Sequence, residues 1–439
     1  MTDFLRSDLS ISPPTLSELF FVFGRIGLLS FGGPAGQIGM MHRVLVDEKR
    51  WLSEERFLHA LNYCMLLPGP EAQQLATYAG WLLHGRRGGI VAGTLFILPG
   101  FLVVVALATA YSLYQDTHWL PALLFGLKAG VLAIVIEALL RVAKRALKSR
   151  FLVGIATAAF IALFFFAIPF PLVILAAGVA GFLKAKGRQV ADPGFQSNAP
   201  SALRQIRGVI GGILVWQMPL LLFWLLAAPE SLVELQTFFS RLAVVTFGGA
   251  YAVLAYVAQV AVETHHWMTA SEMLDGLALA EATPGPLVLV LSYIGFLAAF
   301  RHPGILDPML AGVLGASVAA WATFVPSFIF IFLGAPYVER LKDNAALSGA
   351  LSAITGAVVG VILNLSVWFG LHVLFGKVDR VELLPQINLG MSLPDWSTLD
   401  LVSLTLFLIS AIMLFRLKLG MVPVLGVCIA AGFIRLWLG

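Results

Sequence analysis

Two stretches of the chain decide its fold: residues 23–33 are FGRIGLLSFGG, and residues 239–249 are FSRLAVVTFGG. They lie 216 positions apart and align without a gap. The same offset superposes Pro68-Gly69-Pro70 on Pro284-Gly285-Pro286. Further matches are Trp51 with Trp267, Leu61 with Leu277 and, after an insertion near 301–310, Pro99 with Pro326 and Gly130 with Gly356. A fixed offset sustained over this length indicates a tandem duplication.

The composition places this duplicated chain in a membrane. Of its 439 residues, 59% are hydrophobic and 12% are charged, and the mean hydropathy is +0.91. This leaves too little polar surface for a water-soluble globule. Apolar runs of about 20 residues, long enough to cross roughly 30 Å of hydrocarbon, recur from end to end. We therefore predict an all-α polytopic membrane protein whose solvent is the lipid bilayer.

The apolar runs suggest how the two copies are inserted. We expect about 13 hydrophobic segments: 19–36, 57–83, 89–114, 121–140, 152–168 and 171–183 in the first half, 209–228 between the halves, and 236–258, 272–300, 310–333, 346–375, 400–415 and 420–438 in the second. The predicted domains are an amino-terminal repeat (1–208), a connecting transmembrane helix (209–228) and a carboxy-terminal repeat (229–439). An even number of crossings followed by one connector turns the second copy upside down. The prediction is two homologous repeats of inverted topology.

Loop charges support this inversion. Residues 37–56 contain four Lys or Arg residues, whereas the equivalent residues 253–272 contain none. Because basic loops stay in the cytoplasm, the two loops are expected on opposite sides. Full crossings throughout would put 37–56 outside, but re-entrant broken hairpins over 19–36 and 57–83 would keep it inside. We prefer the re-entrant arrangement.

Helix-breaking residues stand where re-entrant hairpins need them. They are Gly32, Gly33 and Pro68-Gly69-Pro70 in the first half, and Gly248, Gly249 and Pro284-Gly285-Pro286 in the second. The alternative is an ordinary kinked helix at each place. A break within the membrane starts a half-helix whose free N–H groups and positive dipole end favour an anion. We therefore predict that these residues line a substrate-binding site for an anion.

Two arginines add positive charge to the same segments. Arg25 and Arg241 occupy equivalent positions of the repeat, and a charge inside a membrane segment is costly unless it faces a partner or a wet cavity. Related by a pseudo-twofold axis, their guanidinium groups could present two planar forks to one tetrahedral dianion. The alternative is that each arginine extends to the membrane surface or pairs with a carboxylate.

Acidic residues near the breaks are candidates for proton coupling. Glu71 follows the first Pro-Gly-Pro directly, and Glu281 precedes the second by three residues, with Asp275 one and a half turns earlier. The first copy has neither acid at the positions equivalent to Asp275 and Glu281. Inverted repeats are a common plan of secondary transporters, and this asymmetry leads us to expect that the two halves divide the work of transport.

The sequence gives little support to other classes of protein. There is no phosphate-binding Gly-x-x-x-x-Gly-Lys-Ser/Thr loop, no His or Cys pattern typical of a metal site, and no converging set of nucleophile, base and metal ligands. The two cysteines lie far apart in apolar stretches. We expect no enzyme activity, no metal or other cofactor and no nucleic-acid partner.

The residues resemble the chromate ion transporter family in its long two-domain form. The first half is similar in residues 23–34, Leu67-Pro68-Gly69-Pro70 and 97–100, and the second in 246–249 and DGLALAEATPGP at 275–286. The resemblance covers nearly the whole chain. It implies a multi-pass protein of the bacterial inner membrane that exports chromate and protects the cell from it, driven by the proton-motive force.

Several alternatives stay open at this point. Sulfate or another anion is an alternative cargo, because chromate and sulfate have nearly the same shape and charge. A passive anion channel is an alternative mechanism, and a homodimer is an alternative to a monomer. Moving one charge through 100 mV is worth about 2.3 kcal/mol, so a dianion leaves a negative-inside cell with roughly twice that gain. Export is electrically favourable, but the direction of transport and the coupling ion are not fixed by the sequence.

Overall fold

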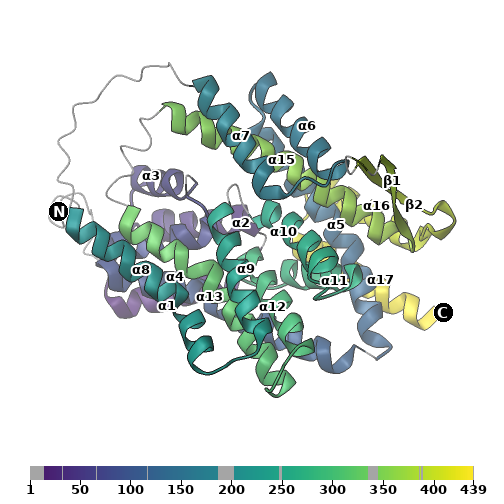
Figure 1. Ribbon diagram of the computed structural model, residues 1–439, viewed down its shortest axis with the longest axis horizontal. Coiled ribbons are helices and arrows are strands. Elements are labelled where there is room, and N and C mark those ends of the chain that lie inside the picture. Colours follow the sequence, from purple (N-terminus) through teal and green to yellow (C-terminus); the bar gives the residue numbers. More distant parts are fainter. Residues whose placement is uncertain are drawn as a thin grey trace. The chain divides into compact units, whose positions relative to one another are not determined.

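The computed structural model describes residues 14–439 except 32, 66, 116, 186–201, 247–249, 335–344, 385, 387–388 and 439 (Figure 1), and describes only the backbone of 202–204, 252 and 438. Within these residues, five helices are long and apolar enough to cross a membrane. They are Glu71–Tyr114 (α4), Trp119–Ala146 (α5), Gln205–Leu225 within α8 (Ala202–Leu225), Pro308–Gly334 (α13) and Ala345–Leu374 (α15). Shorter apolar helices are Arg150–Phe164 (α6), Phe170–Ala185 (α7), Val290–Arg301 (α12), Leu401–Ala411 (α16) and Met421–Leu438 (α17). The chain is therefore a helical, multi-pass membrane protein.

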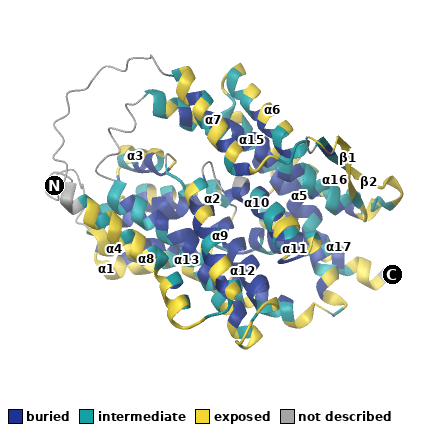
Figure 2. Ribbon diagram, viewed as in Figure 1, coloured by how far each residue is buried: buried dark blue, intermediate teal, exposed yellow. Residues whose placement is uncertain are grey.

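These helices carry many exposed residues (Figure 2), and a large share of the exposed residues are large and apolar. In α8 only 6% of the most apolar stretch is buried, and Leu214, Leu221 and Trp224 are each more than half exposed. A water-soluble protein would not leave so much apolar surface uncovered. These faces suit contact with lipid.

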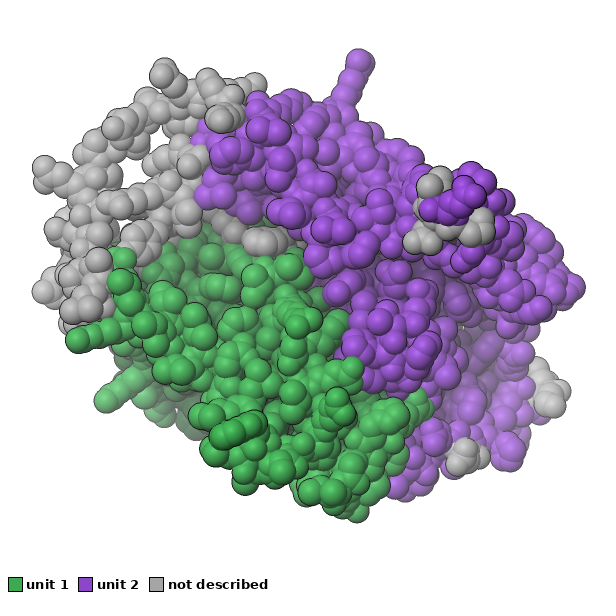
Figure 3. Space-filling model, viewed as in Figure 1, with its two compact units in different colours: residues 1–109, 191–250, 283–341 green, residues 110–190, 251–282, 342–439 purple. Residues whose placement is uncertain are grey.

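The chain forms two compact units, each drawing on both halves of the sequence (Figure 3). Unit 1 contains residues 1–109, 191–250 and 283–341, and unit 2 contains residues 110–190, 251–282 and 342–439. Each unit therefore combines segments from before and after α8. This exchange brings residues distant in the sequence into one core.

Unit 1 begins with α1 (Leu16–Leu29), capped by Thr15 and Glu18 in a reciprocal capping box. Next are α2 (Gly33–His42), the π-helical turn η1 (Arg43–Glu48) and α3 (Glu54–Cys64). Their core contains fully buried aromatic side chains, among them Phe23, Phe57 and Tyr63. Later in the chain come α9 (Glu230–Val245), the short 3-10 turn η3 (Leu287–Leu289) and α12, which packs on α13.

Close helix contacts in unit 1 depend on small residues. A Cβ on Gly295 would lie 2.5 Å from the carbonyl oxygen of Gly315, and one on Gly315 would lie 2.2 Å from that of Gly295. Likewise α4 turns at His84 and Gly85, where φ of Gly85 is +60°, so that its two limbs meet at Gly80 and Gly88. Small residues permit such approach between membrane helices.

Unit 2 is built around α15, which packs against α5, α6 and α7, while α16 and α17 cover α5. It also contains α10 (Ala250–Gln259, whose first residue belongs to unit 1), the π-helical turn η2 (Val260–Thr264), α11 (Ala270–Glu281), the 3-10 turn η6 (Trp396–Thr398) and the π-helical turn η7 (Ile412–Arg416). Between α15 and α16 the chain forms an antiparallel hairpin of β1 (Val378–Leu384) and β2 (Leu389–Pro394).

Element boundaries follow the offset seen in the sequence. α1, α2 with η1, and α3 correspond to α9, α10 with η2, and α11 when 216 is added. The left-handed residues Arg50 (φ 53°) and His266 (φ 51°) are related in the same way, as are the helix caps Ser53 and Thr269. The four apolar segments that carry the predicted breaks are each interrupted between two helices.

Candidate functional site

The two Pro-Gly-Pro segments are joined to the opposite half of the chain in unit 1. The Gly69 N–H donates to the Thr246 carbonyl oxygen at 2.8 Å, and the Gly285 N–H donates to the Ser30 carbonyl oxygen at 2.9 Å. Gly69 and Gly285 are equivalent positions at the 216 offset, and so are Ser30 and Thr246. The two bonds are therefore reciprocal. Each joins the Pro-Gly-Pro of one half to the end of the helix that precedes Phe-Gly-Gly in the other half.

Both glycines adopt a backbone conformation that other residues avoid. φ is +120° at Gly69 and +94° at Gly285. α4 begins at Glu71, directly after Pro70, and η3 begins at Leu287, directly after Pro286. Each Pro-Gly-Pro is thus a sharp turn into a new helix, whose first N–H groups have no partner within that helix. The central N–H of each turn is already bonded across the repeat.

The acceptors of these bonds are held in matching ways. Ser30 Oγ and Thr246 Oγ1 donate to the carbonyl oxygens of Ile26 and Leu242, each at 2.6 Å, in the last turn of α1 and of α9. A hydroxyl that bonds four residues back satisfies itself within the helix. The backbone carbonyls of Ser30 and Thr246 remain available for the glycines.

Buried glutamines lie around the two turns. Gln37 of α2 donates from Nε2 to the Gly285 carbonyl oxygen at 2.5 Å, Gln74 donates to the Pro68 carbonyl oxygen at 2.7 Å, and Gln73 donates to Thr77 Oγ1 at 2.9 Å. All three side chains are at most 1% exposed. Within the described residues, none of their Oε1 atoms has a hydrogen-bond partner. Unit 1 therefore keeps uncommitted polar atoms next to both helix breaks.

The second Pro-Gly-Pro packs against a glycine of α4. A Cβ on Gly100 would lie 2.3 Å from the Pro284 carbonyl oxygen and 3.2 Å from Gly285 Cα. Since a backbone atom is the obstacle, no side-chain rotation could relieve it. Gly100 fixes how closely α4 approaches this turn.

The structure places the predicted arginines on exposed helix faces of unit 1. Arg25 and Arg241 are exposed, whereas Phe23 and Phe239, two residues earlier, are fully buried. In the part of the chain that the structure describes, neither guanidinium has an ion-pair partner. An exposed arginine of a membrane helix faces an aqueous path or extends to the membrane surface.

Not every predicted substrate residue can be placed. Gly32, Gly248 and Gly249 lie outside the described residues. Gly33 is the first residue of α2, with φ of +67°. The turn conformation at Gly33 fits the sequence prediction of a helix break there.

Unit 2 holds two buried carboxylates on α11. Asp275 is 5% exposed; its Oδ1 is 2.8 Å from Lys128 Nζ of α5, and Tyr111 donates to its Oδ2 at 3.1 Å. Lys128 also donates to Ser271 Oγ at 3.0 Å. Asp275 is thus neutralised by a lysine of a neighbouring helix.

Glu281 has a different environment from Asp275. It is 4% exposed and accepts a hydrogen bond of 2.7 Å from the Tyr251 hydroxyl, which is also buried. No lysine or arginine among the described residues lies within ion-pair distance of it. Arg141 and Glu137 of α5 act on Glu281 electrostatically, and these two side chains form an ion pair with each other. A buried ionised carboxylate without a paired cation is costly.

Sequence reasoning missed Gln37, Tyr111 and Tyr251 as members of these clusters. A glutamine in an apolar segment four residues after Gly33 was an available signal for the first. The two tyrosines gave no signal, because tyrosine is common in helices at membrane surfaces. Among the described residues, no three His, Cys, Asp or Glu side chains gather as a metal site.

Apolar helices, paired helix breaks and isolated buried polar groups together define a multi-pass membrane protein with the features of a transporter. Comparison with protein families is more specific. The model of the family "Chromate transporter" matches residues 17–182 and, again, 233–433. The chain belongs to the chromate transporter family.

Curated relatives agree with this assignment. The chain is 31% identical to the chromate transport protein of Pseudomonas aeruginosa over 391 residues, which is 87% of this chain and 86% of the relative. It is 31% identical to that of Cupriavidus metallidurans over 349 residues (79% and 81%), and 29% identical to a probable chromate transport protein of Synechococcus elongatus over 391 residues (87% and 92%). No solved structure matches the chain.

Proposed function

We propose that the protein is a secondary active transporter that exports chromate, or a similar tetrahedral oxyanion, across the bacterial inner membrane and so gives chromate resistance. The reciprocal bonds Gly69 to Thr246 and Gly285 to Ser30 carry this proposal. They join two broken-helix elements of related sequence, and transporters built from inverted repeats bind their substrates between such elements. The chromate transport relatives supply the cargo.

The proposed architecture is two inverted repeats, 1–208 and 229–439, connected by a membrane helix at 209–228. Matching element bounds at one offset support the duplication, and the contrast in loop charge supports the inversion. Alternating access would then consist of motion of one group of segments around the paired breaks. A passive channel, which does not alternate its access between the two sides, would not need such paired elements.

In this mechanism the oxyanion binds near the paired turns. The first-turn N–H groups of α4 and η3 would supply backbone donors, and Pro68, Pro70, Pro284 and Pro286 would hold these helix ends in place. Gln37 and Gln74, whose amide N–H groups donate to the Gly285 and Pro68 carbonyl oxygens, would hold the two turns in shape. Arg25 and Arg241 would attract the dianion along the exposed faces of α1 and α9.

Glu281 is the best candidate for proton coupling. Asp275 is paired with Lys128, and Glu71 lies at the partly exposed start of α4, but Glu281 is buried with a tyrosine hydroxyl as its hydrogen-bond partner. A carboxyl in such a place can take up and release a proton as its access to water changes. We assign Asp275 a structural role in the same helix.

The test is chromate uptake into energised everted vesicles containing wild type, Arg25→Ala, Arg241→Ala or the control Arg207→Ala. Arg207 is an exposed arginine of α8 outside the proposed path. We expect about tenfold slower uptake at low chromate in the first two variants and a wild-type rate in the control. Uptake at the wild-type rate in both would remove the arginines from the mechanism. Competition by sulfate at equal concentration would make sulfate the alternative cargo.

A further inference from the structure

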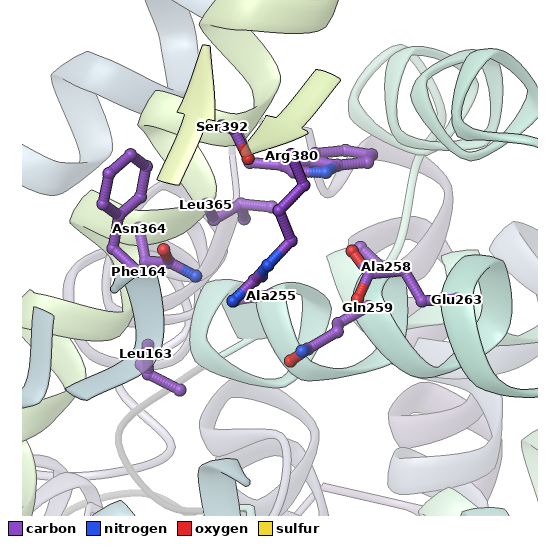
Figure 4. A pocket seen from close by; sticks show the side chains of 11 residues that line it. Leu163, Phe164, Ala255, Ala258, Gln259, Glu263, Asn364, Leu365, Arg380 and Ser392 are labelled. Carbon is purple, nitrogen blue, oxygen red and sulfur yellow. The ribbon is translucent and has the colours of Figure 1, made fainter. Parts of the chain in front are cut away.

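A polar cavity of about 50 Å³ lies in unit 2 between the β hairpin, the end of α6, α10 with η2, and α15 (Figure 4). One water needs roughly 10–15 Å³, so the cavity has room for several waters or one small polyatomic ion. Its polar lining comes from Arg380 of β1, Ser392 of β2, Gln259, Glu263 and Asn364. Four separate parts of the chain contribute to it.

The hairpin register directs two of these side chains to the same place. Arg380 and Ser392 are direct partners across the antiparallel strands, so both point from one face. Gly390, the next partner position on that face, leaves space for the arginine, because a Cβ there would lie 3.4 Å from Arg380 Nε. The Gly390 N–H donates to the Phe165 carbonyl oxygen at 2.8 Å, which holds the hairpin on α6.

The polar side chains of the cavity are not used by the protein itself. In the part of the chain that the structure describes, the Arg380 guanidinium, the Gln259 and Asn364 amides and the Ser392 hydroxyl have no hydrogen-bond or ion-pair partner. Together they offer a planar guanidinium fork, two amides and a hydroxyl. This donor set suits a small tetrahedral oxyanion.

Glu263 introduces an opposing charge. Its carboxylate lines the same cavity, and among the described residues it has no cation within ion-pair distance. A carboxylate beside an anion site weakens binding through like-charge repulsion. Such a site would hold a dianion briefly and let it leave.

We infer that this cavity is a second oxyanion site, at which the cargo rests after it leaves the paired turns. This inference rests on the proposed function. The basic pairs Arg340/Lys342 and Arg416/Lys418 favour the cytoplasm. One predicted crossing leads from each pair to the hairpin, so we expect the cavity on the outer face. Arg380 attracts the dianion, and Glu263 keeps its affinity low.

The experiment measures binding without transport. Ser392→Cys places a thiol in the cavity of the purified protein, while the native cysteines Cys64 and Cys428 are at most 1% exposed. The rate of maleimide labelling is followed against sulfate, with chloride at equal ionic strength as reference. Sulfate is the probe because chromate oxidises thiols. We expect sulfate to slow labelling in a saturable way.

A second substitution in the Ser392→Cys protein tests whether sulfate slows labelling because it binds in the cavity or because of a general effect of the salt on the reaction. Arg380→Gln should raise the half-protecting sulfate concentration about tenfold, and Glu263→Gln should lower it about threefold. Lys377→Gln is the matched control, because Lys377 lies at the base of the same hairpin and pairs with Asp379 at 3.1 Å outside the cavity. It should change the concentration by less than about twofold.

Three results would overturn the second site: no protection by sulfate, an unchanged half-protecting concentration in Arg380→Gln, or weaker protection in Glu263→Gln. Failure of the proposed function has a different signature. Protection that depends on Arg380, in a protein whose energised vesicles take up no chromate, would leave the cavity as an oxyanion site and reject export of chromate.

Discussion

Removal of the Lys128 charge should strongly destabilise unit 2. Lys128 Nζ lies 2.8 Å from Asp275 Oδ1, and the two side chains are only 18% and 7% exposed. Lys128→Met keeps the length of the side chain and leaves a buried carboxylate whose remaining partner is the Tyr111 hydroxyl. Breaking a buried pair costs about 3–5 kcal/mol, and the tyrosine bond favours the lower end. A loss of about 3 kcal/mol raises the unfolded fraction roughly a hundredfold.

The assay is reversible unfolding in mixed micelles of a mild and a denaturing detergent, followed by tryptophan fluorescence. Asp275→Asn in the Lys128→Met background removes the unpaired charge and should recover all but about 1 kcal/mol. Asp275→Asn alone should cost less than Lys128→Met, because the more exposed Lys128 can reach water. A cost below about 1 kcal/mol for Lys128→Met, or a double variant no more stable than the single one, would contradict a buried and coupled pair.

Two further predictions concern the turn at Pro284 and the base of the hairpin. Gly100→Ala should cost about 1–3 kcal/mol and lower the melting temperature in detergent, because its Cβ would meet the Pro284 carbonyl oxygen at 2.3 Å, whereas Gly24→Ala, with no atom within 4 Å, should not. Ser397 donates its hydroxyl and N–H to Asp395, and these bonds hold the pKa of that carboxyl below its usual range. The stabilisation of the hairpin base by these bonds is therefore fully present above the usual pKa of Asp395 and is lost as pH falls through the lowered pKa. The protection of the amides at the hairpin base, which is the exchange rate relative to that of an unstructured amide at the same pH, should therefore be constant near neutral pH and fall only in strong acid; a loss of protection between pH 7 and 5 would contradict this.

The sequence predicted the helix breaks well, because glycine and proline impose local conformations. The positive φ angles at Gly33, Gly69 and Gly285 are local consequences of residue type. The offset of 216 likewise anticipated which elements would correspond, since related sequences repeat the same caps and turns. These features needed no knowledge of long-range contacts.

Contacts between distant segments could not be predicted in this way. Nothing in periodicity indicates that Gly69 bonds to Thr246, or that Lys128 reaches Asp275 rather than the membrane surface. The two compact units that mix both halves are a consequence of tertiary packing, which hydropathy does not encode. The arginines show the same limit, since their sequence positions are equivalent but their exposure is decided by neighbouring helices.

Proton-coupled export is tested most directly by chromate accumulation in everted vesicles with the membrane potential clamped at zero. An acidic interior then supplies only a pH gradient, so a passive channel has no voltage to follow. Wild type should accumulate chromate above the bath concentration until a protonophore is added. In vesicles with Glu281→Gln, which keeps an acceptor for the Tyr251 hydroxyl, the internal chromate concentration should rise only to that of the bath. Wild-type uptake that stops at the bath concentration under the pH gradient would contradict proton-coupled export.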